Sequence, residues 1–346
     1  MILVLGAAAL IWWGGAFFGM ARAVRLLILT VLFAAVLSVQ WVLPPENGLR
    51  QATGGSAALW LILGGCGIVA GGYARLVAAL RARAQPKEQT VTQKTGTFSE
   101  TELNRYARHI VLREIGGPGQ RKLKQAKVLV IGAGGLGAPA LQYLAAAGVG
   151  TIGVIDDDDV ENANLQRQVI HREGDIGLPK VFSAQKAMLA QNPHVEIRPY
   201  HRRLNEEIAE ELFGEYDLIL DGTDNFETRY LANRVAVKMG KPLISGALSQ
   251  WEGQLSVFHP KAGGPCYQCI FPEAPAPGLA PSCSEAGVIG PLPGVIGSMM
   301  AVETIKQITG AGAVLRAEMM IYDGLYGETR KIRLSQRADC PVCGSG

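Results

Sequence analysis

The sequence predicts an α/β protein built on a doubly wound, Rossmann-like parallel sheet with an antiparallel extension, preceded by transmembrane helices. Two observations predict this fold class. Three long apolar runs fill most of residues 1–83. The rest of the chain alternates between apolar runs of strand length and helical stretches, the pattern of a sheet covered by helices on both faces. The expected strands lie near 127–132, 151–156, 195–200, 217–221 and 242–246, and the helices between them include Ala138–Ala147, Val181–Gln191 and Phe226–Met239.

The N-terminal apolar runs, at about 2–20, 26–43 and 57–74, are each close to the roughly 17–25 residues that a helix needs to cross a bilayer. We therefore expect residues 1–83 to form a transmembrane region within the lipid bilayer, followed by a polar linker at 84–97. A signal peptide is disfavoured, because no positive charge precedes the first run and further apolar runs follow it. The alternative is a hairpin of two spans with the first run lying in the membrane interface.

Basic residues indicate the orientation of this region. Arg22 and Arg25 lie in the first connection, and four more basic residues follow the third run: Arg75, Arg81, Arg83 and Lys87. Under the positive-inside rule both positions face the cytoplasm and the N-terminus faces out. We expect a multi-pass protein of the cell inner membrane, with the domain 98–346 in the cytoplasm.

Charge is unevenly divided along the chain. Residues 1–95 hold eight of the 33 Lys and Arg but only two of the 30 Asp and Glu, so acidic residues slightly outnumber basic ones in the remainder. The pI near 8.5 therefore reflects the anchor and its basic flank. It gives no reason to expect nucleic-acid binding.

The domain 98–346 opens on a helix start signal. Ser99-Glu-Thr-Glu102 has the spacing of a capping box, which predicts a helix through about Glu114. A spacing of three residues would place Arg105 and Arg108 on one face of that helix.

The strand expected at 127–132 runs into glycines at positions 132, 134 and 137. Where side chains are missing, backbone N–H groups can approach phosphates at a helix N-terminus, so Gly132, Gly134 and Gly137 indicate a nucleotide site. Asp156, at the end of the next strand, is placed to bind ribose hydroxyls. The alternative is a tight structural turn. A Walker A loop is excluded, because no Gly-Lys-Ser/Thr follows.

The charged residues after Asp156 indicate a triphosphate. Arg167 and Lys180 can neutralise phosphate oxygens, and Asp224 at a strand end can hold Mg²⁺. Asn164 and Gln168 can add hydrogen bonds. Taken singly, each has a simpler explanation, a solvated surface charge or a helix cap.

The C-terminal part is predicted to complete the sheet. A helix at Gly294–Ile308 is expected to end at Gly310 in the left-handed conformation. Gln254–His259 and Met319–Leu334 are expected to add antiparallel strands.

Four cysteines form two Cys-x-x-Cys pairs, Cys266 with Cys269 and Cys340 with Cys343. Four thiolates suit tetrahedral Zn²⁺, and all four positions being filled leaves no open site for catalysis. A structural zinc would clasp the C-terminal tail to the body of the domain. The alternative is a pair of redox dithiols.

Cys283 stands apart, after a proline-rich run at 271–281. A thiol at the end of a substrate-sized loop is accessible, as a covalent carrier must be. It is a candidate catalytic residue.

With these motifs in view, residues ~99–346 resemble the MoeB/ThiF/HesA family, relatives of the ubiquitin-activating enzymes. The resemblance rests on six motifs: Arg105-Tyr-Ala-Arg108-His-Ile-Val-Leu, Gly132-Ala-Gly-Gly-Leu-Gly137, Asn164-Leu-Gln-Arg-Gln168, Asp221-Gly-Thr-Asp-Asn225, Gly253-Gln and the two Cys-x-x-Cys pairs. It implies an enzyme that uses ATP and Mg²⁺ to adenylylate the C-terminal glycine carboxylate of a ubiquitin-like sulfur-carrier protein ending in Gly-Gly.

Roles carry over from the family position by position. Asp156 would hold the ribose, Gly135 would back the phosphates, and Arg167 and Lys180 would grip them. Asp224 would bind the metal. Arg108 would reach into the site of a partner subunit, which implies a homodimer. Cys283 occupies the position where ubiquitin-activating relatives and ThiF-type proteins use a cysteine, whereas MoeB-type activity is not expected to depend on it.

Within the family the chain is most similar to MoeB-type members, which implies a MoaD-like carrier and a role in molybdenum cofactor biosynthesis. A ThiS-like carrier in thiamine or another sulfur pathway is the nearest alternative. The glycine motif also allows an NAD(P)-dependent oxidoreductase, although that chemistry has no need of Arg167, Lys180 and Asp224. The last alternative is an inactive scaffold that keeps the fold for binding alone.

Overall fold

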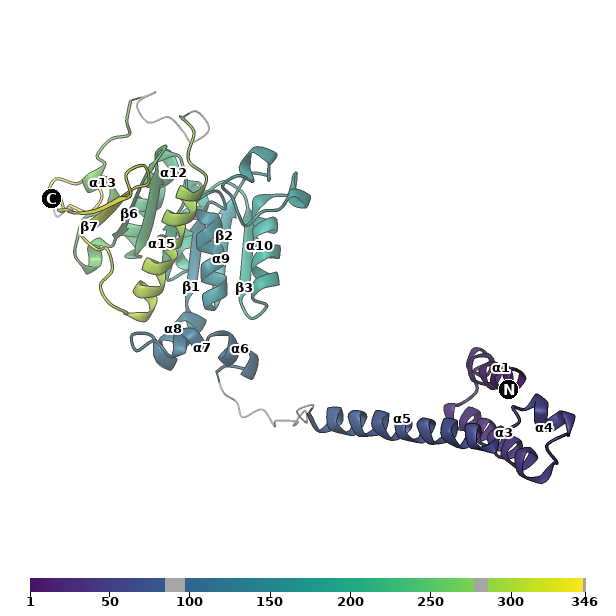
Figure 1. The fold of residues 1–346 in the computed structure, drawn as a ribbon. Helices are drawn as coiled ribbons and strands as arrows, with labels where there is room; N and C mark the ends of the chain where they lie inside the picture. The colour runs from purple at the N-terminus through teal and green to yellow at the C-terminus, as the bar shows by residue number, and fades with distance from the viewer. Residues whose placement is uncertain (85–96, 277–285, 345–346) are drawn as a thin grey trace. The chain divides into compact units, whose positions relative to one another are not determined.

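The computed structural model describes residues 1–84, 97–276 and 286–344. The chain divides into two compact units, Met1–Lys94 and Thr95–Gly346, each with its own internal contacts. Figure 1 shows both units.

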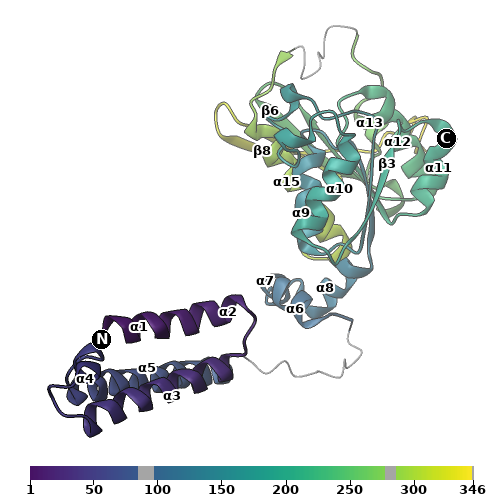
Figure 2. The same cartoon turned by 90° about the vertical axis from the view of Figure 1, so that its right-hand side faces the viewer.

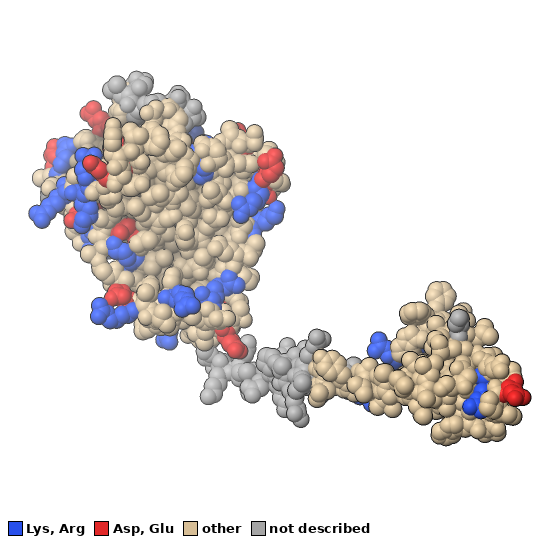
Figure 3. Space-filling view, viewed as in Figure 1, with Lys and Arg blue, Asp and Glu red and all other residues tan. Residues whose placement is uncertain are grey.

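The N-terminal unit is helical throughout. Its elements are α1 (Ile2–Ala9), η1 (Leu10–Gly14), α2 (Gly15–Phe17), α3 (Arg22–Val42), α4 (Gly48–Ala52) and α5 (Ala57–Ala84). Two helical segments, Arg22–Val42 and Gly48–Val77, are long and apolar enough to cross a membrane by length and composition, whereas the first helical run is shorter. The helix expected over 2–20 therefore ends early, at Phe17, before the turn that leads into α3. The surface of this unit carries few charges (Figure 3).

Polar contacts join the helices of the N-terminal unit to one another and to the connection between α3 and α5. Arg25 is buried, donates to the Trp12 carbonyl at 2.9 Å and lies 5.0 Å from the centre of the Trp12 ring. At the other end of α3, buried Gln40 donates to the Thr53 hydroxyl at 2.7 Å. The N-terminal amine contacts the Ala52 carbonyl at 2.5 Å. The first run thus lies alongside α3 and α5, with the N-terminus beside the α3–α5 connection (Figure 2).

The second unit is built on one eight-stranded sheet of order β3-β2-β1-β4-β5-β6-β7-β8. The first five strands pair in parallel, and the last three add antiparallel. This is the predicted α/β sheet with its antiparallel extension. The strands are β1 (Lys127–Ile131), β2 (Thr151–Asp156), β3 (Glu196–His201), β4 (Leu218–Asp221), β5 (Leu243–Leu248), β6 (Glu252–Phe258), β7 (Glu318–Asp323) and β8 (Glu328–Arg333).

Helices cover both faces of the parallel part because its strands are apolar on both sides. In β1, Val128 and Val130 join one core cluster and Leu129 and Ile131 join the other. One face carries α9 (Gly137–Ala147), α10 (Lys180–Gln191) and α15 (Pro291–Thr309), and the other carries α11 (Glu206–Gly214) and α12 (Phe226–Met239). Short segments complete the unit: η2 (Asn162–Asn164), η3 (Glu173–Asp175), η4 (Pro260–Ala262) and α13 (Tyr267–Ile270).

The prediction of a single helix from Ser99 to Glu114 is wrong. The capping box at Ser99 and Glu102 is confirmed, but the helix is interrupted at Tyr106. The segment forms α6 (Glu100–Arg105) and α7 (Ala107–Ile110), followed by α8 (Gly116–Gln125). Tyr106 is buried and its hydroxyl accepts from Asn192 at 2.9 Å, so a tertiary contact outweighs the local helix signal. Gly310 does end α15 at φ +81°, as predicted.

Candidate active site

A cavity of about 540 Å³ opens at the carboxyl ends of the parallel strands. In doubly wound sheets ligands bind at this edge. Eight residues singled out in the sequence line it: Gly132, Gly134, Gly135, Asp156, Arg167, Gln168, Lys180 and Asp224.

The glycine loop needs its glycines for close backbone packing. Gly132 has φ +93°, a conformation that side chains disfavour. A β-carbon at Gly137 would lie only 1.9 Å from the Gly132 carbonyl oxygen. Its missing side chain lets α9 begin directly against the loop. Gly137 does not line the cavity.

Asp156 is bonded to the glycine loop from the end of β2. Its two carboxylate oxygens accept from the Ala133 N–H at 2.7 Å and the Asp158 N–H at 2.9 Å. Burial raises the pKa of Asp156, while the nearby charge of Lys180 acts in the opposite direction. The carboxylate thus helps to set the shape of the loop and stays at the cavity wall.

Two cations and an amide also line the cavity. The Lys180 ammonium is buried and lies 2.5 Å from the exposed carboxylate of Asp158. Arg167 is partly exposed and donates to the Ala163 carbonyl at 3.0 Å. Gln168 is buried, and its Oε1 atom has no hydrogen-bond partner within the described part of the chain. These groups offer positive charge and an amide to a ligand.

Asp224 lies at the cavity edge with its side chain exposed. Asp221 at the end of β4 fixes the loop that carries Asp224. It accepts hydrogen bonds from the Thr223 hydroxyl at 2.6 Å and from the Ser245 hydroxyl at 2.8 Å. Arg229 donates to Asp221 at 3.3 Å and to the Gly246 carbonyl at 2.8 Å. Carboxylate oxygens are the ligands that Mg²⁺ prefers, so Asp224 fits a metal-binding role.

The structure does not bring Asn164 and Arg108 to the cavity. Asn164 is buried in η2, where its side chain accepts from the Glu161 N–H at 3.1 Å. Arg108 is exposed on α7, which packs against α8 at the edge where β1 begins (Figure 1). That edge is opposite to the cavity of the same chain.

Sequence reasoning missed the groups that support the cavity. Arg229 and Ser245 were not singled out, although both contact Asp221. His171 was not singled out either, yet it contacts the glycine loop. A single sequence gives no signal for such partners, because they come from different elements.

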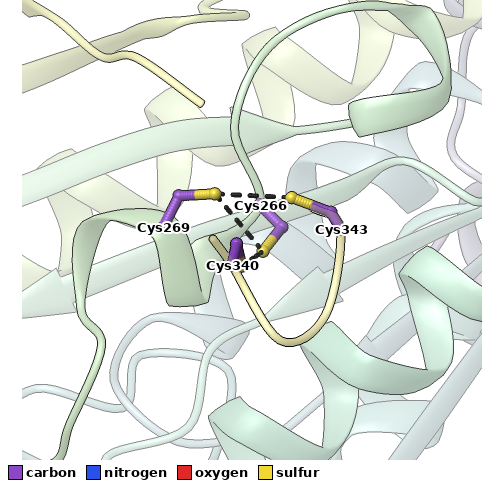
Figure 4. A group of neighbouring side chains, drawn as sticks. All are labelled: Cys266, Cys269, Cys340 and Cys343. Carbon is purple, nitrogen blue, oxygen red and sulfur yellow. Dashed lines mark hydrogen bonds between the residues drawn. The ribbon is translucent and has the colours of Figure 1, made fainter. Parts of the chain in front are cut away.

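Four cysteine sulfurs come together next to α13 (Figure 4). The Sγ–Sγ distances are 3.9 Å between Cys266 and Cys269, 3.6 Å between Cys266 and Cys340, and 3.4 Å between Cys269 and Cys343. A tetrahedral zinc with Zn–S bonds of about 2.3 Å separates its sulfurs by about 3.8 Å. The cluster therefore has the donor set and spacing of a Cys₄ zinc site, formed between two segments 74 residues apart.

Cys283, the remaining catalytic candidate, lies outside the described residues.

The chain matches the ThiF family model over residues 106–342. It is 49% identical to the "Sulfur carrier protein adenylyltransferase" of Thermus thermophilus over 71% of this chain and 93% of that protein. It is 44% identical to the "SAMP-activating enzyme E1" of Haloferax volcanii over 73% of this chain and 93% of that protein. The chain belongs to the ThiF family. As predicted, it is an adenylyltransferase.

Solved structures resemble this ThiF-family chain as well. One is E. coli MccB with ATP, which is 25% identical, has a TM-score of 0.61, and matches 70% of this chain and 74% of MccB. The family match at residues 106–342 lies within the second unit.

Proposed function

We propose that the protein is a membrane-anchored enzyme that uses ATP to adenylylate the C-terminal glycine carboxylate of a ubiquitin-like sulfur-carrier protein, with release of pyrophosphate. The observation that carries this proposal is the convergence of the glycine loop, Asp156, Arg167, Lys180 and Asp224 on one cavity. The relatives named above support the substrate class, because one is named a sulfur carrier protein adenylyltransferase and another a SAMP-activating enzyme E1.

The cavity suits the electrostatics of this reaction. A carboxylate that attacks the α-phosphate of ATP meets like-charge repulsion, so catalysis depends mainly on positioning and charge neutralisation. Arg167 and Lys180 provide cations, and the glycine loop provides backbone N–H groups. No general base is required, because the attacking carboxylate is already ionised at neutral pH.

Lys180 must exchange partners when a triphosphate binds. In the structure its ammonium is paired with Asp158, whose carboxylate is largely exposed. A phosphate oxygen competes with that carboxylate for the same buried cation. Mg²⁺ bound at Asp224 would neutralise further phosphate charge, and Asp156 would accept from a ribose hydroxyl.

The finer assignments belong to the same proposal. We favour a MoaD-like carrier and molybdenum cofactor biosynthesis, on the similarity to MoeB-type members of the family. A ThiS-like carrier presents the same terminal carboxylate and is the nearest alternative. The cluster of cations in the cavity favours a triphosphate over NAD(P).

Arg108 acts in this proposal from a partner subunit. Its exposed position at the edge of the sheet opposite its own cavity is compatible with a role in a homodimer and not with one in its own site. The N-terminal helices would hold the dimer at the inner membrane with the catalytic domain in the cytoplasm, where ATP is available.

Pyrophosphate exchange tests the proposal. The full-length protein is incubated with ATP, Mg²⁺, labelled pyrophosphate and purified MoaD-like or ThiS-like carriers. We expect label to enter ATP only when a carrier with an intact Gly-Gly end is present. The matched control is the same carrier without its last glycine. If the enzyme is folded and no carrier supports exchange, the proposal is contradicted.

A further inference from the structure

The glycine loop is held in place by a buried histidine from outside the loop. His171 lies between η2 and η3 and is 3% exposed. Its Nε2 atom is 3.0 Å from the Ala133 carbonyl oxygen, and its Nδ1 atom is 2.8 Å from the Ser183 hydroxyl. A carbonyl oxygen has no proton to give, so Nε2 is the donor.

This hydrogen bond fixes the orientation of one peptide group. The peptide joining Ala133 and Gly134 is trans, so its C=O and N–H point in opposite directions. With the Ala133 carbonyl turned toward His171, the Gly134 N–H is turned away from the histidine. Gly134 lines the nucleotide cavity, and no acceptor for its N–H is present among residues 97–276 and 286–344.

The neighbouring contacts make the histidine the deciding restraint. The peptide before Ala133 is already fixed, because the Ala133 N–H donates to Asp156. Glycine resists rotation of the next peptide only weakly, since both signs of φ are accessible to it. Without a donor at the position of Nε2, the peptide between Ala133 and Gly134 is free to flip and to present a carbonyl oxygen to the phosphates.

The histidine is itself held firmly by α10. Ser183 is fully buried on α10, and its hydroxyl oxygen lies 2.8 Å from Nδ1 and 2.9 Å from the Asp175 carboxylate. Asp175 also accepts from Lys186 at 2.9 Å. The helix that provides Lys180 to the cavity therefore also anchors the ring that orients the glycine loop.

We propose that His171 is a positioning residue for nucleotide binding, which aims the Gly134 N–H at a phosphate oxygen by holding the Ala133 carbonyl. The proposal rests on the proposed function, because it assumes that the cavity binds a nucleoside triphosphate. His171 does not touch the reacting atoms. Its loss acts on the nucleotide through the loop.

Two substitutions separate this role from simple packing. A glutamine side chain places its amide nitrogen close to the position of histidine Nε2, and an asparagine side chain places it close to Nδ1. His171→Gln therefore keeps a donor for the Ala133 carbonyl, whereas His171→Asn keeps only a partner for Ser183. Both replacements are polar amides, so the burial of a polar group changes little between them.

The measurement is the dissociation constant of the α,β-methylene analogue of ATP with Mg²⁺, by calorimetry on the full-length protein. We expect His171→Asn to raise the constant about ten-fold or more, the effect of one lost hydrogen bond to a charged group, and His171→Gln to stay within about three-fold of the unchanged protein. His259→Gln is the control, because His259 also contacts a glycine carbonyl, that of Gly240 at 3.3 Å, but lies outside the cavity. We expect it to leave the constant unchanged.

Each result decides the proposal. Equal affinities for the Asn and Gln variants would overturn it, whether both bind tightly or both bind weakly, because the donor at Nε2 would then not matter. If His171→Asn does not fold, a folded His171→Gln variant that binds about ten-fold more weakly overturns it, and one that binds normally supports it. If the unchanged protein does not bind the analogue, the proposed function fails first and this inference fails with it.

Discussion

Arg229 and Asp221 form a buried ion pair directly beneath the loop that carries Asp224. Their side chains are 3.3 Å apart and only 6% and 1% exposed. Arg229 also donates to Ser245 and to the Thr223 and Gly246 carbonyls, so one guanidinium joins the end of β4 to β5 and to the loop. A fully buried ion pair therefore fixes the loop that carries the exposed Asp224.

Breaking this pair should be costly. We expect Arg229→Met to lower the free energy of unfolding by about 3 to 5 kcal/mol, because it leaves the Asp221 carboxylate buried and uncompensated. Guanidinium denaturation of the full-length protein measures the change. Arg234→Met, on the same helix, removes an exposed pair with Glu206 and should cost less than about 1 kcal/mol. Equal losses in the two variants would contradict the role given to Arg229.

Asp224 should be essential for chemistry and unimportant for stability. We expect Asp224→Asn to reduce pyrophosphate exchange by about 100-fold or more, because the triphosphate charge is no longer compensated by a bound metal. The melting temperature should stay close to that of the unchanged protein, since the carboxylate is exposed. Glu227→Gln, at the second residue of α12 and also exposed, is the control and should keep full activity. Near-normal exchange in Asp224→Asn would remove Asp224 from the site.

Much of the fold was predictable because it is encoded locally. The strands β1, β2, β4 and β5 are apolar runs with Gly, Asp or Pro at one or both ends, and β1 to β5 each begin and end within two residues of the expected positions. In contrast, α8 contains three glycines and a proline in ten residues, and no propensity argument predicts it. It forms because it packs on α15, where Lys122 donates to the Thr309 carbonyl at 2.9 Å. Such a contact joins residues far apart in the chain.

The site divides in the same way. Asp156 and the glycines were found because they follow strands, and strand ends meet at one edge of a parallel sheet. His171, Arg229 and Ser245 support the cavity through hydrogen bonds that depend on the packing of separate elements. The pattern of residues around each of them does not indicate its partner.

Arg108 should act on the partner's site. If it does, mixing Arg108→Ala with Asp224→Ala subunits should restore about a quarter of the activity, since half the dimers are hybrids and each hybrid holds one complete site. The measurement is pyrophosphate exchange after confirmed subunit exchange. Arg113→Ala is the control, because Arg113 is highly exposed and, within the described residues, pairs only with its neighbour Glu114. No recovery would show that Arg108 acts within its own chain or not at all.

The cysteine cluster should hold one Zn²⁺ per chain. Because a closed four-sulfur site has no position for substrate, Cys343→Ser should lower the melting temperature by about 5 °C or more and leave the KM for ATP nearly unchanged. Metal analysis and thermal unfolding provide the two readouts. Cys66→Ser, an exposed cysteine in α5 of the N-terminal unit, should change neither. Purified protein without zinc, or with a Cys266–Cys269 disulfide, would contradict the assignment.

The N-terminal unit should cross the membrane with its N-terminus outside. The amine of Met1 lies against Ala52, in the connection between α3 and α5, so these two positions share one side of the bilayer. Under the positive-inside rule, we expect the side that carries Arg22 and Arg25 to face the cytoplasm. Reporter fusions after Arg25, after Gly48 and after Lys87 should therefore read cytoplasm, exterior and cytoplasm.

An epitope tag placed before Met1 tests the first helical run itself. With about 1.5 Å of rise per residue, the run from Ile2 to Phe17 is shorter than a bilayer core of about 30 Å, so it spans only if the bilayer thins locally beside α3. We expect the tag to be accessible from outside, because the contact between Arg25 and Trp12 holds the run against α3. A cytoplasmic tag together with an exterior reporter after Gly48 would instead place the first run in the interface and leave a two-span hairpin.

A version beginning near Thr97 should keep its adenylylation activity, because every proposed site residue lies at or beyond Arg108. An inactive folded truncation would show that the N-terminal unit contributes to the active dimer.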